Sequence, residues 1–442
     1  MKNIKAIQLF VAALAMCSAH ADDIGYRFVA DHADSLYRVG EQAVITITAT
    51  NGAGVAVKSG GCRLEVDNFG KKSMEVRPRV NFATDNPIVV TGRLDRPGFV
   101  RVRLLGKGIP WATQWCVGFD VDKIRPGSAR PADFDAFWDR AIERFAKEVP
   151  VDAKMELDEK ASGGSHDCYA LTFATVPKGR VIRGQLTIPR GDGPWPVSMT
   201  VPGAGSGSWG YERLKGRARL VLNVLDYPCR PDADHPVKEL YAKQNAHWGG
   251  KSGCGRNWYY EGDLSKGPEE FFYYGAILGI NRAVDWVAAL DRIKAGDFTY
   301  AGHSQGGAFG IILAALNGNL TQAQLSEPAI TDISGFLDDG RQSGWPTLPE
   351  KMHGKPLFDS MMKWLPYFDC AHFAPRIRIP TRWLVGFTDE LCTPQSIWAG
   401  YNCLTCPDRK IVCWPGLNHG FPEAVYNQAA KALEASWQQQ TP

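Results

Sequence analysis

The chain has 442 residues, enough for about three average domains. Its 44% hydrophobic and 22% charged residues are typical of a folded globular protein and exclude a disordered chain, a collagen-like fibre and a long coiled coil. A net charge of +3 gives no basic surface for nucleic acid or an anionic membrane, so we expect a neutral or weakly charged partner.

The first 21 residues predict a secretory signal peptide. Lysines precede the apolar run 7–16, and an Ala-His-Ala segment before Asp22 offers the small residues that a signal peptidase recognises. The run is too short for a stable membrane span, and no other run approaches the ~20 apolar residues that a transmembrane helix needs. We therefore expect export to the periplasm or the medium. We expect no lipid anchor, because Met16 is bulky where a lipoprotein signal needs a small residue.

Eleven cysteines are present, and ten remain once Cys17 leaves with the signal peptide. An even number in an oxidising compartment favours disulfides. Cys62 and Cys116 are the only two in the N-terminal region, so we expect them to pair, whereas the sequence does not connect the other eight. Cys403 and Cys406 have a spacing found in zinc sites, but a second close pair is missing, so we expect no metal.

Residues 22–122 predict a β-sandwich domain. Residues 43–49 and 100–104 alternate apolar and polar side chains, which is the period of a half-buried strand. Turn residues separate these short strands, a pattern typical of a sandwich. The pattern contains no catalytic residues, so a packing or spacing role is favoured over carbohydrate binding or oligomerisation.

A linker over residues 123–131 leads to a second domain over residues 132–442. Phe134, Trp138 and Phe145 share one face of an amphipathic entry helix. Beyond it, apolar strands alternate with helices, which indicates the α/β class, with a mostly parallel sheet and helices on both faces. The predicted strands are 181–188, 197–201, 220–225, 298–301, 382–387 and 410–414, and the predicted helices are 270–291, 306–317 and 422–437.

A candidate nucleophile lies in Gly302-His303-Ser304-Gln305-Gly306, a G-x-S-x-G motif. The motif alone is weak, but it follows the strand 298–301 and opens an apolar helix. That context is the nucleophile elbow, a tight strand-to-helix turn that exposes the serine hydroxyl above the sheet. The helix N-terminus favours negative charge developing there.

A serine hydroxyl needs a base, and the base needs an orienting acid, which in this arrangement follow in the order Ser, Asp, His. Asp389 begins the loop after the strand 382–387, with Glu390 as the second choice of acid. His419 lies on a short loop after the next strand and before the last helix. Three residue types in this order, each just past a strand, predict a catalytic triad of Ser304, Asp389 and His419.

The same chemistry needs an oxyanion hole. We expect one donor to be the backbone N–H of Gln305, directly after the nucleophile, and the second to be that of Ala204, after the strand 197–201. Residues 205–210 match the dinucleotide motif G-x-G-x-x-G, but the match starts too far past its strand and leaves too little room for a helix. We therefore expect no organic cofactor.

Residues 125–435 resemble the acetyl xylan esterase and cephalosporin C deacetylase family, carbohydrate esterase family 7. The resemblance rests on Pro131–Trp138, Phe271–Tyr274, Gly302–Gly307 and Gly386–Pro394, the last with the pattern Gly-x-x-Asp-x-x-Cys-x-Pro. It implies the α/β-hydrolase fold, the same roles for Ser304, Asp389 and His419, and the backbone N–H of Gln305 in the oxyanion hole. The family usually has His-Gly-Tyr where this chain has Pro202-Gly203-Ala204, so the tyrosine side chain is missing here.

We therefore predict a serine carboxylesterase that removes acetyl groups from O-acetylated carbohydrate, as in acetylated xylan or xylo-oligosaccharides. Trp248, Trp258 and Tyr260 are candidates for stacking on sugar rings, although packing within the protein would use the same residues. Two alternatives remain: an exported serine peptidase of the prolyl oligopeptidase type, and a non-catalytic carbohydrate-binding protein. The sequence leaves the oligomeric state open.

Overall fold

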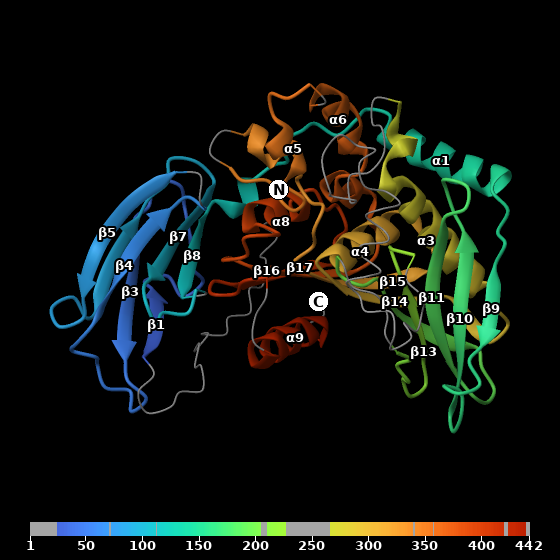
Figure 1. The fold of residues 1–442 in the computed structure, drawn as a ribbon, viewed down its shortest axis with the longest axis horizontal. Coiled ribbons are helices and arrows are strands. Elements are labelled where there is room, and N and C mark those ends of the chain that lie inside the picture. Colours follow the sequence, from blue (N-terminus) through green and yellow to red (C-terminus); the bar gives the residue numbers. More distant parts are fainter. Residues whose placement is uncertain are drawn as a thin grey trace.

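The computed structural model of the protein contains two layers of β-sheet at the N-terminal end and one large sheet with helices on both faces (Figure 1). It describes residues 24–69, 72–111, 113–204, 210–226, 266–338, 341–356, 358–419 and 423–438. Within these ranges no helix has the length and apolar character needed to cross a membrane.

The N-terminal sheets pack face to face and share one apolar core. Strand β3 (Ala43–Thr50) alternates buried and half-buried residues, as its period predicted, and directs Ile45 and Ile47 inward. Leu64 and Val102 of the second sheet join them in the same cluster, so this part is a β-sandwich. One sheet has the order β1 (Gly25–Ala30), β3, β6 (Ile88–Gly92); the other has the order β2 (Leu36–Tyr37), β8 (Gln114–Phe119), β7 (Gly98–Leu105), β4 (Gly61–Asp67), β5 (Ser73–Asn81).

The predicted disulfide between Cys62 and Cys116 is wrong, because both residues are free cysteines. Cys62 is on β4 and Cys116 is on β8, and β7 lies between these two strands. Two strand spacings are roughly 10 Å, and a disulfide needs Cα atoms within about 7 Å. In the strand register, Arg101 of β7 lies opposite both Asp67 of β4 and Cys116 of β8. Cys116 is therefore next to the end of β4 that is far from Cys62.

Within the described residues the large sheet has nine strands, and it confirms the mostly parallel architecture expected from the sequence. Six neighbouring strands run parallel, and β11, β10 and β9 continue the sheet in antiparallel pairing. The order is β17 (Arg409–Trp414), β16 (Thr381–Gly386), β15 (Leu320–Ser326), β14 (Ile293–His303), β12 (Trp195–Thr200), β13 (Ala218–Leu222), β11 (Val181–Pro189), β10 (His166–Ala174), β9 (Lys154–Leu157).

Helices cover both faces of this sheet, as the alternation of strands and helices predicted. On β16, Trp383 belongs to the core cluster that contains Ile397 of α8 (Pro394–Tyr401), whereas Leu384 packs with Ala429 of α9 (Glu423–Gln438). Figure 1 shows α8 and α9 on opposite sides of β16 and β17. The other α-helices in the described part of the chain are α1 (Phe134–Glu148), α3 (Phe272–Ala288), α4 (Gln305–Leu316), α5 (Leu348–Met352), α6 (Phe358–Trp364) and α7 (Cys370–Phe373).

Candidate active site

The turn between β14 and α4 holds Ser304 in a conformation that its glycine neighbours make possible. Ser304 has φ 57°, in the left-handed region that non-glycine residues rarely adopt. A Cβ at Gly302 would lie 2.5 Å from the carbonyl oxygen of Gly306, and one at Gly306 would lie 2.1 Å from that of Val201. Side chains at either position would therefore push the turn apart, which explains why the motif needs glycine on both sides of the serine.

The structure brings Ser304, His419 and Asp389 together at the carboxyl ends of β14, β17 and β16. Nε2 of His419 lies 3.0 Å from Oγ of Ser304, and Nδ1 of the same ring lies 2.8 Å from Oδ2 of Asp389. Parallel strands end at the same edge of a sheet, which is why residues 85 and 30 positions apart in the chain meet there. The distances are those expected for the predicted nucleophile, base and orienting acid in one hydrogen-bonded line.

Asp389 is fixed in position by its own loop. Its side chain is fully buried, and its Oδ1 accepts hydrogen bonds from the backbone N–H groups of Leu391 (2.8 Å) and Cys392 (2.9 Å). Oδ2 is left to accept the N–H of His419. Burial raises the pKa of Asp389, and the hydrogen bond from His419 acts against that increase. The carboxylate therefore holds the ring in the tautomer that leaves Nε2 free to accept a proton.

The two segments expected to supply the oxyanion hole are joined by the side chain of Gln305. This buried side chain donates to the carbonyl oxygen of Pro202 (3.2 Å) and accepts from the hydroxyl of Tyr273 (2.9 Å). Ala204 lies two residues beyond Pro202 and is half-buried against the main core. The roles of the Gln305 and Ala204 N–H groups remain predictions, but their two segments are held next to each other by one hydrogen-bonded amide.

We expect the replacement of Gln305 by Leu to lower kcat about tenfold. Removing an oxyanion donor outright costs about 10²–10³ in kcat, and here both backbone donors stay but lose the bond that aligns them. Steady-state kinetics with p-nitrophenyl acetate measure the change. Tyr273→Phe is the matched control, because it removes one bond of the amide while keeping the bond to Pro202. An unchanged kcat in Gln305→Leu would contradict this role for the amide.

The β-sandwich packs against the loops that carry Asp389 and His419. Phe99 of β7 meets Phe387 edge to face, with ring centroids 5.0 Å apart. The side-chain amide of Gln114 donates to the carbonyl oxygen of Thr388 (3.4 Å). The backbone N–H of Cys116 donates to the carbonyl oxygen of Pro415 (3.1 Å). This arrangement agrees with the packing role that the sequence favoured for the domain.

Glu390, the second choice of acid, belongs to this domain contact. Its carboxylate pairs with the guanidinium of Arg101, a buried residue of β7 that also binds Asp67. Of Asp389 and Glu390, it is Asp389 that forms the hydrogen bond with His419. The three predicted sugar-stacking residues, Trp248, Trp258 and Tyr260, lie outside the described residues.

Sequence reasoning missed Glu327, a fully buried carboxylate 3.8 Å from Nδ1 of His419. His303, Glu327 and His419 form one of two groups of described residues that have the donor types of a metal site, and Asp389, Cys392 and His419 form the other. Both groups need His419, whose ring nitrogens already face Ser304 and Asp389. A metal in either group would therefore displace a hydrogen bond of the triad.

Residues 119–439 match the family model described as acetyl xylan esterase (AXE1). The chain belongs to this family. The match confirms the family resemblance predicted from the motifs, and it identifies the esterase as a carboxylic ester hydrolase. A curated relative, acetyl esterase Axe7A of Xylanibacter ruminicola, is 26% identical over 93% of this esterase and 92% of its own length.

Two solved structures share the fold of the esterase. The acetyl xylan esterase from Paenibacillus sp. R4 has 22% identity and a TM-score of 0.57, over 71% of this chain and 98% of its own. Acetyl xylan esterase 1 from Thermoanaerobacterium sp. JW/SL YS485 has 19% identity and a TM-score of 0.58, over 72% of this chain and 98% of its own. These likenesses show that the large sheet and its helices have the α/β-hydrolase fold.

Proposed function

We propose that this esterase removes acetyl groups from O-acetylated carbohydrate, such as acetylated xylan or xylo-oligosaccharides, through an acetyl-enzyme on Ser304. The observation that carries the proposal is the position of His419, whose two ring nitrogens lie within hydrogen-bond distance of Ser304 and Asp389. Membership of the acetyl xylan esterase family and the similarity to a curated acetyl esterase support the acetyl ester as the group attacked.

In the first half of the reaction, Oγ of Ser304 attacks the carbonyl carbon of the acetyl group while Nε2 of His419 takes the hydroxyl proton. Asp389 stabilises the imidazolium that forms, because its carboxylate accepts the Nδ1–H bond throughout. The negative oxygen of the tetrahedral intermediate faces the N–H groups of Gln305 and Ala204. When the intermediate collapses, His419 gives its proton to the departing sugar oxygen, and the acetyl group stays on Ser304.

The second half of the reaction repeats these proton transfers with water. His419 takes a proton from a water molecule, whose oxygen attacks the acetyl carbonyl carbon. The intermediate collapses to acetate, and Ser304 recovers its proton from His419. Every proton in this cycle passes through one imidazole, so the rate depends on His419 being neutral before each attack.

We propose further that the esterase acts outside the cytoplasm, where polysaccharide is found. This rests on the signal-peptide pattern of residues 1–21, which lie outside the described residues. The limits of the sandwich domain (22–122), of the linker (123–131) and of the catalytic domain (132–442) are also proposed from the sequence alone, from the change in the pattern of strands and helices.

Acetate release from acetylated xylan and acetylated xylo-oligosaccharides tests the proposed substrate. We expect release from both, and we expect hydrolysis of p-nitrophenyl acetate, with no cleavage of prolyl peptides. Ser304→Ala serves as the matched control for a trace esterase contaminant. Hydrolysis of p-nitrophenyl acetate without release from any acetylated carbohydrate would contradict the substrate, and peptide cleavage would favour the prolyl oligopeptidase alternative.

A further inference from the structure

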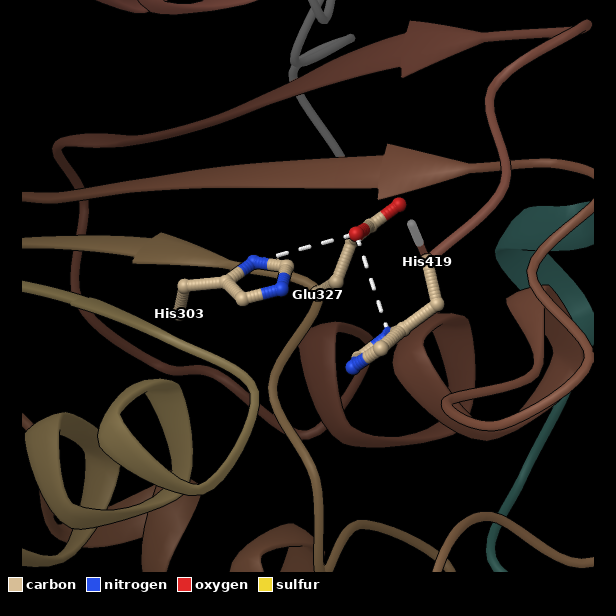
Figure 2. A group of neighbouring side chains, drawn as sticks. All are labelled: His303, Glu327 and His419. Carbon is tan, nitrogen blue, oxygen red and sulfur yellow. Dashed lines mark ion pairs between the residues drawn. The ribbon is translucent and has the colours of Figure 1, made fainter. Parts of the chain in front are cut away.

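Glu327 places a second carboxylate beside the ring of His419. It follows β15 directly, and β15 lies between β14 and β16 in the sheet, so its side chain lies between the strand of Ser304 and the strand of Asp389. Figure 2 shows Glu327 between the rings of His303 and His419. Its Oε2 lies 3.8 Å from Nδ1 of each ring. Nδ1 of His419 is the atom that already bonds Asp389 at 2.8 Å, so two carboxylates face one N–H.

The environment of Glu327 is closed to solvent. The side chain is fully buried; the backbone of Gly386 is the polar neighbour that acts to lower its pKa, although the contact is not a hydrogen bond of ordinary geometry. Burial and the charge of Asp389 raise the pKa of Glu327 well above its usual range. Asp389 has its backbone donors from Leu391 and Cys392, so the single negative charge of the pair rests on Asp389.

Two further titratable groups of the described residues near Glu327, His303 and Cys392, are held in their neutral forms at pH 7. Burial lowers the pKa of His303, at the end of β14, to about 4. Burial raises the pKa of the Cys392 thiol, on the loop after β16, well above its usual range. Among the described residues, Asp389 and Glu327 are therefore the two carboxyl groups that face Nδ1 of His419.

We propose that Glu327 is a reserve acid of the triad, a positioning residue that can hold the Nδ1–H of His419 and balance its positive charge when Asp389 carries none. The inference rests on the proposed function, because it assigns Glu327 to the same base. Three features support it: the distance to Nδ1, the complete burial, and a place at the end of the strand between the nucleophile strand and the acid strand. A rotation of the carboxyl group or a small movement of the ring would close the 3.8 Å gap once Asp389 is removed.

The test compares Asp389→Ala with Asp389→Ala/Glu327→Gln in the full chain. Loss of the acid from a serine triad costs on the order of 10⁴ in kcat when nothing replaces it. We expect Asp389→Ala to lose only about 10²-fold, and the double variant to lose about 10⁴-fold. Asp389→Ala/Glu390→Gln is the matched control and should behave as Asp389→Ala, because the carboxylate of Glu390 is held by Arg101.

The pH dependence separates an acid from a merely structural residue. Removing the charge of Asp389 lowers the pKa of Glu327 relative to the wild type, since that charge is one cause of the increase. In Asp389→Ala, activity needs an ionised Glu327 to accept the Nδ1–H of His419. The logarithm of kcat/KM should therefore fall more steeply toward acidic pH in Asp389→Ala than in the double variant, where Gln does not titrate.

Equal activities in the two variants, with equal slopes, would overturn the proposal. If Asp389→Ala does not fold, as judged by thermal unfolding, Asp389→Asn with and without Glu327→Gln gives the same comparison, because Asn keeps an oxygen for the N–H groups of Leu391 and Cys392. Failure of the proposed function looks different: the wild type would then hydrolyse no acetyl ester, or Ser304→Ala would keep its activity.

Discussion

Replacement of Ser304 by Ala is expected to lower kcat by about 10⁴–10⁶-fold while the protein stays folded. The hydroxyl removed is the atom that would form the bond to the acetyl group, and it lies 3.0 Å from Nε2 of His419. Alanine fits the turn without new contacts, although Ser304 has a positive φ that alanine tolerates no better. Initial rates with p-nitrophenyl acetate and thermal unfolding of the same sample measure the two parts of this prediction.

Ser198→Ala is the control for this substitution. Ser198 belongs to β12, the strand beside β14, and its hydroxyl accepts a hydrogen bond from Arg219 away from the triad. We expect its kcat to stay within about threefold of the wild type, as is usual for a substitution that leaves the reacting groups in place. A Ser304→Ala protein that kept more than a tenth of its activity would refute the assignment of the nucleophile.

Replacement of Arg101 by Leu is expected to destabilise the protein by about 3 kcal/mol. Arg101 is 4% exposed and binds both oxygens of the buried Asp67, while its third nitrogen binds Glu390. Leucine would leave the buried Asp67 with Arg103 as its remaining ion-pair partner among the described residues, and losing the two-point contact with Arg101 is costly for a buried carboxylate. Glu390 is next to Asp389 in the same loop, so losing its contact with Arg101 would loosen the position of Asp389. We therefore also expect kcat/KM to fall about tenfold. Urea unfolding and steady-state kinetics measure the two effects.

Arg38→Leu is the control for Arg101→Leu. Arg38 also pairs with an aspartate of the sandwich, Asp120, but its own side chain is 70% exposed. Exposed pairs contribute about 0–1 kcal/mol, so the loss of stability should be several times smaller and kcat/KM should not change. If Arg101→Leu lost stability at full activity, the sandwich would not hold the acid loop in place.

The positions of the predicted triad residues could be found from the sequence because each follows a strand with a strong local signal. The strands before Ser304, Asp389 and His419 are apolar runs, and the glycines around the serine reflect contacts that no side chain could accept. Such signals lie within a few residues of the site. The expectation that these three strand ends meet came from the fold class, because the sequence itself shows no contact between them.

Glu327 was missed because the strand before it was missed. Strand β15 (Leu320–Ser326) contains two glutamines and a threonine, and it has no apolar run, yet it is an interior strand, between β14 and β16. A charged residue followed by Pro328 then has the appearance of a surface turn. Its burial depends on packing between distant segments, which local periodicity does not report.

The disulfide prediction failed for a related reason. Counting cysteines shows which ones are available, but pairing depends on strand order, and β7 enters the sheet between the strands of Cys62 and Cys116. Strands β9 and β10 were also missed, and they extend the sheet in antiparallel pairing beyond its parallel part. In each case the missing information is which segments become neighbours in space.

The contact between the sandwich and the catalytic loops has a consequence for anyone who wishes to shorten this enzyme. A truncated form that begins near the linker would present Phe387 to water and would leave the carbonyl of Pro415 without its N–H donor. Such a fragment would need a redesigned outer surface at these two loops before it could serve as a minimal catalyst. Fusions to other modules are therefore better attached before the first strand than in place of the sandwich.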